Sequence, residues 1–293
     1  MATENAPQYV DSRRIGESTV TIINDGISRW TPNVDVPPDA LRAAMPEMDA
    51  RGQITIGFHV AFIRHGGALI LVDAGFDDPD SAWGRKFPTL WGGAVRSPGV
   101  EAGLRSIGVR PADITHVVIT HAHFDHYVGA TIERDGGYVA RFPNARHLIG
   151  RADRTMSRYG RTPDPELASR METLERLGLL ELVDGDRAIV PGVTMIHAPG
   201  ESPGHSIVRV ASAGEHFYAL GDVFHHPCEV EHLDWTLTGR DRAAMRATRD
   251  RLLVRVIPEN ATLMYAHAHF PPWGRIVPIG DGFRWADDPG PLD

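Results

Sequence analysis

Short hydrophobic runs separated by turns recur along the chain and predict a protein rich in β-strands. Residues 54–64 form one run, Gly66-Gly67 follows as a turn, and residues 68–73 form a second run, which together predict a hairpin. Residues 114–120 have Val117-Val118-Ile119 at their centre and predict a buried strand. The second half of the chain repeats the pattern at residues 193–197, 206–211, 217–220 and 261–266.

Helical patterns lie between these runs. Helices are predicted over residues 100–108, 164–178 and 241–257 and from Val128 onward. Residues 76–100 predict a long loop whose Trp83, Phe87 and Trp91 either line an apolar pocket, pack internally or form a dimer contact. The order of elements predicts one α/β domain over residues 19–293, built from two β-rich halves covered by helices. Residues 1–18 are expected to form an N-terminal arm.

Composition and charge exclude several classes of protein. The chain has 293 residues, of which 42% are hydrophobic, and 30 glycines and 22 prolines predict many turns. A formal net charge of −8 disfavours a nucleic-acid partner. No apolar run approaches the ~18 residues of a membrane-spanning helix, and no signal peptide is visible. The single cysteine, Cys228, excludes an intrachain disulfide and predicts a cytoplasmic protein.

The strongest chemical signal is His121-Ala-His123-Phe-Asp125-His126, which directly follows a predicted strand. Imidazole and carboxylate are ligands for zinc and similar metals, and four such side chains in six residues suit two adjacent ions. The alternative is a polar loop of surface histidines. Three more residues fit the same constellation because each lies at the end of a predicted strand: His205, Asp222 and His269.

Together these motifs resemble the metallo-β-lactamase superfamily, over roughly residues 55–280. The resemblance implies an αβ/βα four-layer sandwich with a dinuclear site, and it suggests a homodimer. It assigns His121, His123 and His205 to the first metal ion. It assigns Asp125, His126 and His269 to the second ion, with Asp222 bridging both. The Asp73-Ala-Gly75 turn matches a segment that packs under the site, so Asp73 is expected to orient a ligand.

Two histidines remain ambiguous within this resemblance. His267 competes with His269, and residues 269–276 resemble the methyl parathion hydrolase-like branch, which favours His269. His225 stands where acyl-homoserine lactonases have a tyrosine that hydrogen-bonds the substrate. We therefore expect His225 either to donate to a developing oxyanion or to be a structural histidine.

These features predict a hydrolase with two divalent ions, for which zinc is the first candidate. A metal-bridging hydroxide would open a lactone or carboxylic ester. Asp125 is both an expected ligand and a candidate proton shuttle. Phosphotriester hydrolysis is the alternative activity, and a mononuclear iron persulfide dioxygenase shares much of the ligand set. Few cations and many aromatic residues flank the motifs, which favours an uncharged, partly apolar substrate, although Arg275 or Arg85 could fold back toward the site.

Other members of the superfamily fit less well. A flavodiiron protein would carry Glu in place of His123 and needs a flavin domain. A true β-lactamase normally lacks the carboxylate at Asp222, and a nuclease normally shows a basic surface. A non-catalytic metal-binding scaffold is disfavoured because the expected ligands are nearly complete. Cys228 has no neighbouring pattern of a nucleophile and is expected to be a buried apolar residue.

Overall fold

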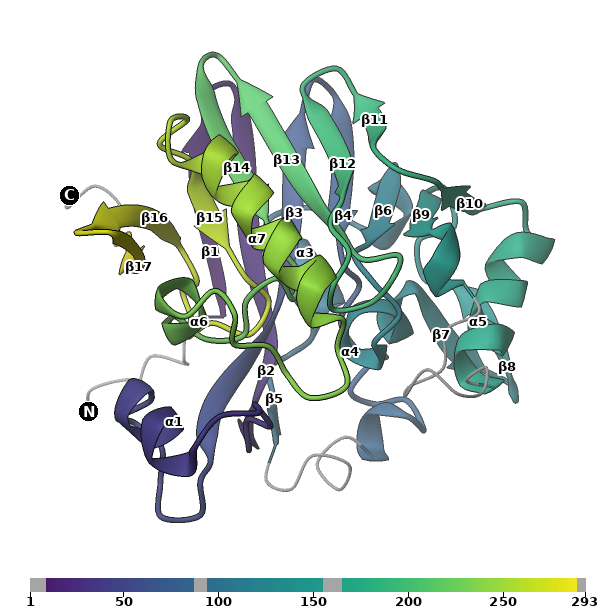
Figure 1. Ribbon diagram of the computed structural model, residues 1–293. Helices are drawn as coiled ribbons and strands as arrows, with labels where there is room; N and C mark the ends of the chain where they lie inside the picture. Colours follow the sequence, from purple (N-terminus) through teal and green to yellow (C-terminus); the bar gives the residue numbers. More distant parts are fainter. Residues whose placement is uncertain (1–8, 87–93, 155–164, 289–293) are drawn as a thin grey trace, which may run out of the picture.

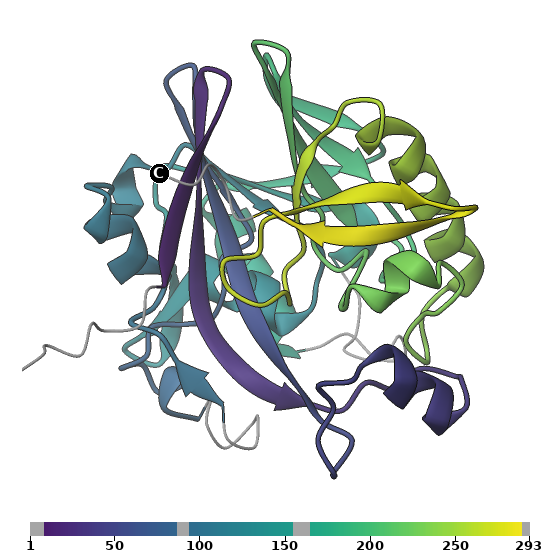
Figure 2. The same ribbon diagram turned by 90° about the vertical axis from the view of Figure 1, so that its left-hand side faces the viewer.

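Two β-sheets pack face to face, and helices cover their outer surfaces (Figures 1 and 2). The computed structural model describes residues 9–86, 94–154 and 165–288. Within these ranges the first sheet has eight strands. They are β1 (Val10–Ile15), β2 (Ser18–Trp30), β3 (Ile54–His65), β4 (Ala68–Val72), β6 (His116–Ile119), β9 (Arg146–Gly150) and β10 (Leu180–Val183) in that spatial order, with β5 (Val95–Arg96) beside β2.

In the described part of the chain, the second sheet has seven strands, which follow one another in chain order. They are β11 (Arg187–Val190), β12 (Val193–His197), β13 (Ser206–Ser212), β14 (Glu215–Ala219), β15 (Thr262–Met264), β16 (Gly274–Ile279) and β17 (Gly282–Asp287). A separate hairpin pairs β7 (Thr131–Arg134) with β8 (Gly137–Ala140). The α-helices are α1 (Pro38–Ala44), α3 (Val100–Ser106), α4 (Phe124–Tyr127), α5 (Pro165–Arg176), α6 (Cys228–Glu231) and α7 (Arg242–Val256). None of these described helices combines the length and apolar character that crossing a membrane requires.

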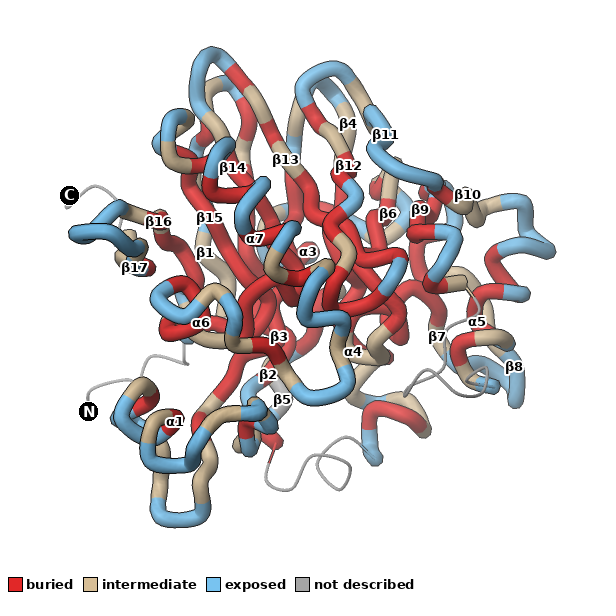
Figure 3. The backbone as a smooth tube through the Cα atoms, in the orientation of Figure 1, coloured by how far each residue is buried: buried red, intermediate tan, exposed pale blue. Residues whose placement is uncertain are grey.

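Three layers of hydrophobic core separate the four layers of secondary structure, and the strand β6 shows why. Its Val118 packs between the two sheets, whereas Val117 and Ile119 face the helices on the other side. A strand buried on both faces reads as a continuous hydrophobic run, which is how residues 114–120 appear in the sequence. Figure 3 shows the buried strands at the centre and exposed hairpin tips around them. The predicted αβ/βα four-layer sandwich is therefore confirmed.

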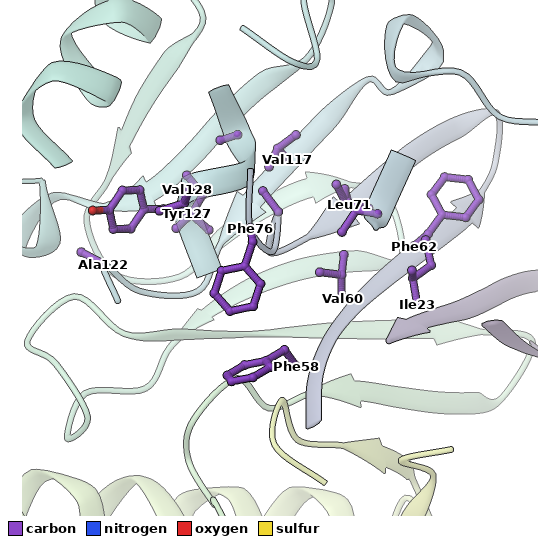
Figure 4. Packing of buried hydrophobic residues seen from close by; sticks show 14 of the residues in the cluster. Ile23, Phe58, Val60, Phe62, Leu71, Phe76, Val117, Ala122, Tyr127 and Val128 are labelled. Atoms are coloured by element: carbon purple, nitrogen blue, oxygen red, sulfur yellow. The ribbon is translucent and has the colours of Figure 1, made fainter. Parts of the chain in front are cut away.

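The helices bury the outer faces of both sheets. Leu104 of α3 and Met171 of α5 pack against the first sheet, and Met245 and Leu252 of α7 pack against the second. Figure 4 shows part of the first cluster, where Phe58 and Phe76 meet edge to face with 5.0 Å between ring centroids. The predicted helices at 100–108 and 241–257 are confirmed; of the helix predicted over residues 164–178, residue 164 lies outside the described residues and the remainder is confirmed.

Three sequence expectations need correction. Residues 10–15 do not form an arm, because β1 pairs with β2 along all six residues and Ile15 is buried between the sheets. The helix expected from Val128 onward is instead the short α4, followed by a 3₁₀ turn over Val128–Ala130. Trp83 stacks on Phe76 and is buried, so it packs internally, whereas Phe87 and Trp91 lie outside the described residues.

Candidate metal centre

Most residues of the predicted motif lie close together, just beyond the ends of strands from both sheets. β6 runs into His121, β14 into Asp222 and β15 into His267. β4 and β6 are parallel in one sheet, and β14 and β15 are parallel in the other. The carboxyl ends of parallel strands share an edge, so loops from both sheets place their side chains together there.

The first group of potential ligands contains His121, His123, Glu201 and Asp222. Their nearest donor atoms all lie within 4.8 Å of one another. His121 Nε2 is 2.7 Å from His123 Nδ1 and 3.5 Å from Asp222 Oδ2. The two imidazoles and two carboxylates therefore converge on one point.

The second group contains Asp125, His126 and His267, and Asp222 faces it as well. His126 Nε2 lies 3.4 Å from Asp125 Oδ2 and 3.4 Å from Asp222 Oδ1. His267 Nε2 lies 3.3 Å from Asp222 Oδ2. A single carboxylate between two groups of ligands is the arrangement that a bridging role requires.

Hydrogen bonds on the outer side fix the orientation of these histidines. His126 Nδ1 donates to Asp73 Oδ2 at 2.8 Å, and His267 Nδ1 donates to the Gly57 carbonyl at 2.9 Å. Each bond leaves the Nε2 lone pair directed into the cluster. Asp73 also accepts from the Thr120 backbone N–H at 2.7 Å, so it orients a cluster residue without entering the cluster.

The pKa values of the cluster's histidines shift in two opposite directions. Burial, followed by neighbouring histidines, lowers the pKa of His121, and burial with nearby Arg240 lowers the pKa of His123 to about 3. Both imidazoles are therefore neutral, as metal ligation requires. Burial opposes protonation of His126 and His267 too, but the adjacent carboxylates, Asp222 first, raise their pKa values.

Several buried polar atoms in the cluster have no hydrogen-bond partner among the described residues. They include His126 Nε2, Glu201 Oε2 and Asp222 Oδ1. Buried polar atoms are normally hydrogen-bonded, and a bound metal ion would satisfy these. Imidazole nitrogens with carboxylate oxygens form the donor set of zinc and of other divalent first-row metals. The residues present therefore fit a pair of such ions.

The structure places His267, and not His269, in the cluster. The His267 side chain is buried, whereas His269 is exposed. β3 determines this choice, because Gly57 N and His59 N bond to the backbone carbonyls of His267 and Ala266 and hold the segment in place. The preference for His269 is therefore corrected; the contact that decides it links residues more than 200 positions apart.

His205 lies beside the cluster with both ring nitrogens already engaged. Its Nδ1 donates to the Ala198 carbonyl at 3.0 Å, and its Nε2 accepts from the Asp222 backbone N–H at 3.1 Å. A carbonyl only accepts and an amide only donates, so these bonds fix the tautomer, with the proton on Nδ1 and the lone pair on Nε2. Gly221, at φ +51°, permits this approach, because a Cβ there would lie 2.7 Å from His205 Nε2.

Two residues at the centre, Glu201 and Arg240, were missed in the sequence. Glu201 Oε1 lies 3.2 Å from His123 Nδ1 and accepts from Arg240 Nε at 2.6 Å. The sequence does hold one sign of Glu201. It is the only acidic residue between Asp186 and Glu215, and it stands in the turn-rich segment Pro199-Gly-Glu-Ser-Pro-Gly-His205. Arg240 lies directly after a cation-free stretch and has no sequence motif of its own.

His225 borders the second group. Its Nε2 is 3.3 Å from Asp222 Oδ2, and its ring stacks against His267 and Trp30. Burial disfavours its protonated form, but Asp222 and a hydrogen bond with Glu229 raise the pKa of His225 to about 10. Cys228, three residues on, is buried as expected.

Comparisons with known proteins agree with this arrangement. Residues 59–267 match the model of the metallo-beta-lactamase superfamily. The N-acyl homoserine lactonase AttM of Azorhizobium caulinodans is 29% identical over 168 residues, which is 52% of this chain and 59% of that protein. An N-acyl homoserine lactonase of Bacillus cereus is 30% identical over 111 residues, 36% of this chain and 37% of that protein. The matched regions thus span between about a third and three fifths of these relatives.

Solved structures show the same fold at low identity. AidC, described as a dizinc quorum-quenching lactonase in complex with a product, superposes with a TM-score of 0.77 at 19% identity, covering 97% of this chain and 98% of that one. The family match covers well over half of the 293 residues. The chain therefore belongs to the metallo-β-lactamase superfamily.

Proposed function

We propose that this chain is a hydrolase that opens a lactone or a carboxylic ester at a site for two divalent ions, with zinc as the first candidate. The observation that carries the proposal is the position of Asp222, whose carboxylate faces both groups of potential ligands. Ions bound there would polarise the scissile carbonyl and activate a water molecule, so no serine or cysteine nucleophile is needed.

The protein side chains divide the remaining tasks. Asp222 would hold the two ions together, and Asp125 would ligate and carry a proton from the attacking water toward the leaving oxygen. His225, held against Asp222 and Glu229, would donate a hydrogen bond to the oxygen on which negative charge develops. Asp73 would keep His126 oriented through its Nδ1 hydrogen bond.

A groove lined in part by His226, the residue after His225, would hold an apolar part of the substrate. It has a volume of about 470 Å³ and runs between α1 and α6, lined by Ala40, Ala43, Ala44, Pro227, Cys228 and Trp235 among others. His226 also lines it and follows His225 in the chain. The similarity to N-acyl homoserine lactonases suggests an acyl-bearing lactone as the substrate that fits this groove.

A hydrolysis screen on the metal-loaded protein tests the proposal, with acyl lactones, aryl esters, phosphotriesters, thioesters and β-lactams as substrates. We expect the highest kcat/KM for a lactone or ester, and close to two metal ions per chain by elemental analysis. A preference for phosphotriesters would establish the alternative activity. A single bound iron and no hydrolysis would refute the proposal in favour of persulfide oxidation.

A further inference from the structure

Asp153 is a buried carboxylate that belongs to neither group of potential ligands. It lies in the 3₁₀ turn Arg151–Asp153, directly after β9, and none of its surface is exposed. Its Oδ2 accepts from the Ala122 backbone N–H at 3.0 Å and from Ser202 Oγ at 2.5 Å, and its Oδ1 accepts from the Gly204 backbone N–H at 2.6 Å. A buried charge is costly unless it is hydrogen-bonded, and these three donors satisfy both oxygens.

The donors come from one loop of each sheet. Ala122 stands between His121 and His123, in the loop that follows β6. The other two donors belong to the loop between β12 and β13, whose Glu201 and His205 also lie at the cluster. The rings of His205 and His121 have centroids 5.1 Å apart, and Glu201 Oε1 is 3.2 Å from His123 Nδ1. One carboxylate therefore holds together two loops whose side chains must meet at the first group.

Two glycines permit the close packing around Asp153. A Cβ at Gly204 would lie 2.6 Å from Asp153 Oδ1, and a Cβ at Gly150 would lie 2.1 Å from the Gly204 carbonyl oxygen. Both distances are too short for a Cβ, so only glycine fits at these two places. The end of β9 and the loop between β12 and β13 therefore touch through backbone atoms, and a shift of Asp153 would move that loop.

Asp73 holds the neighbouring part of the loop that follows β6. It accepts from Thr120 N at 2.7 Å, whereas Asp153 accepts from Ala122 N. Asp73 also bonds to His126 of the second group, whereas the three bonds of Asp153 all go to the loops of the first group. The two carboxylates should therefore control different ions.

We propose that Asp153 is a positioning residue for the first metal ion. It sets the spacing between the loop that carries His121 and His123 and the loop between β12 and β13. This inference rests on the proposed dinuclear function, and it concerns how the fold holds one of the two ions. It adds no ligand to the site and removes none.

Replacement of Asp153 by asparagine should loosen this connection without changing the size of the side chain. In either orientation of the amide, its NH₂ group faces a backbone N–H, of Gly204 or of Ala122, and that N–H loses its acceptor. We expect Asp153→Asn to weaken binding of one zinc ion by at least about tenfold and to leave the affinity for the other within about twofold of the wild-type value. A general loss of stability would instead weaken the binding of both ions.

Zinc titration of the full chain, stripped with a chelator, tests the assignment without measuring turnover. The variants are Asp153→Asn, Asp73→Asn and the double variant, and elemental analysis counts the ions that stay tightly bound. Asp49→Asn is the matched control, because the Asp49 carboxylate also accepts from two backbone N–H groups, those of Arg51 and Gln53, at 2.8 and 2.9 Å. Circular dichroism establishes that each variant folds.

We expect two tightly bound ions in the wild type and in Asp49→Asn, and one in each of Asp153→Asn and Asp73→Asn. The double variant should bind neither ion tightly, because the two carboxylates act on different ions. If Asp153→Asn binds both ions as tightly as the wild type, or weakens both equally, the assignment is overturned and the proposed function stands. One tightly bound ion in the double variant, with one weakened in each single variant, would overturn it too.

Two further results complete the test. Absence of metal binding by the wild type would refute the proposed function itself. If Asp153→Asn fails to fold, Ser202→Ala takes its place, because it removes one donor and keeps the carboxylate. Ser202→Ala should weaken binding of one ion by at least about threefold, and unchanged binding of both ions would contradict the assignment.

Discussion

Asp73 shows how one residue outside the ligand groups can control the metal centre. Its backbone has φ +63°, a conformation that asparagine also tolerates, so Asp73→Asn changes the side chain with little backbone cost. The carboxylate accepts from Thr120 N, Thr120 Oγ1 and His126 Nδ1. An amide at this place must point its NH₂ at one of these donors, which loosens the imidazole of His126.

We expect Asp73→Asn to weaken binding of the ion at the His126 group by about 10–100-fold. Asp222→Ala should be more severe, with loss of an ion and collapse of hydrolysis, because Asp222 faces both groups. Isothermal titration of the stripped protein with zinc gives both affinities. Full activity and two tightly bound ions in Asp222→Ala would show that the bridging assignment is mistaken.

His147 in β9 predicts a pH dependence of stability that is independent of the metal centre. Its ring is buried, and burial lowers its pKa to about 4 from an ordinary 6.5. Below pH 6.5 the unfolded chain therefore binds a proton that the folded chain does not. The contribution of His147 to the free energy of unfolding is therefore complete above pH 6.5. It is lost as the pH falls toward 4, and the loss is about 2 kcal/mol at pH 5.

His147→Asn removes this titration while keeping a donor for the Ala145 carbonyl. Urea unfolding of the metal-free wild type and variant at pH 7 and pH 5 measures the effect. The wild type should lose about 2 kcal/mol more than the variant over this interval. Equal losses would mean that His147 is protonated equally in the folded and unfolded states.

At the residue scale, local spacing explains what the sequence could predict. His121, His123, Asp125 and His126 lie within six positions at a strand end, so their proximity is independent of the rest of the fold. The choice between His267 and His269 depends on hydrogen bonds to β3, and the place of Glu201 depends on Arg240 and His123. Such long-range contacts leave no periodic pattern in the chain.

At the scale of elements, burial on both faces decides which strands the hydrophobic pattern of the sequence predicts. β6 lies between two cores and appears as a continuous hydrophobic run, whereas β13 also lies between two cores but has Arg209 at its centre. β1, by contrast, has the sequence VDSRRI and lies at the edge of its sheet, with three charged residues among six. Its place is fixed by pairing with β2 and by the hydrogen bond from Trp273 to Asp11, neither of which a local pattern predicts.

The short helix α1 offers a test of the proposed acyl site. Ala43 is exposed and lines the groove between α1 and α6. A phenylalanine there should occupy the space without disturbing the core, and so exclude a long acyl chain. We expect Ala43→Phe to lower kcat/KM for a long-chain acyl lactone at least about fivefold, while a short-chain lactone is nearly unaffected, since one or two buried methylenes contribute about 1–2 kcal/mol.

Ala247→Phe is the matched control, because Ala247 is an exposed alanine of α7 that does not line the groove. Steady-state kinetics with lactones of graded chain length distinguish the two variants. If Ala43→Phe affects all chain lengths equally, the groove is not the acyl site, and the apolar part of the substrate binds elsewhere.

At the scale of the whole molecule, the two halves of the chain build one sheet each, and the site lies where their strand ends meet. The sequence predicts this two-sheet plan because the strand ends carry the chemical motifs. It does not predict the depth of burial at the centre, where Asp222, His121 and His126 are each at most 2% exposed. That burial strengthens every charge interaction in the site and makes its net charge decisive for substrate choice.

The distribution of cations around this buried centre predicts an uncharged substrate. A phosphate dianion would need arginine or lysine donors near the reacting oxygen. Among the residues that the structure describes, Arg240 lies beside the cluster, and its Nε already donates to Glu201. The two arginines that the sequence left open do not reach the site, because Arg275 pairs with Asp288 and Arg85 bonds to the Asp80 carbonyl. The formal net charge of −8 further repels anions.

We therefore expect kcat/KM to be higher for a long-chain acyl lactone and for an aryl acetate than for an aryl phosphate monoester, by at least about a hundredfold. The kcat/KM of each of the two neutral substrates should change little between low and high salt, because binding of a neutral molecule does not depend on long-range charge. The three substrates are compared with the same metal-loaded preparation, and the uncatalysed rates are subtracted. A clear preference for the monoester would require donors that the described residues do not supply, and would contradict both the charge argument and the proposed substrate class.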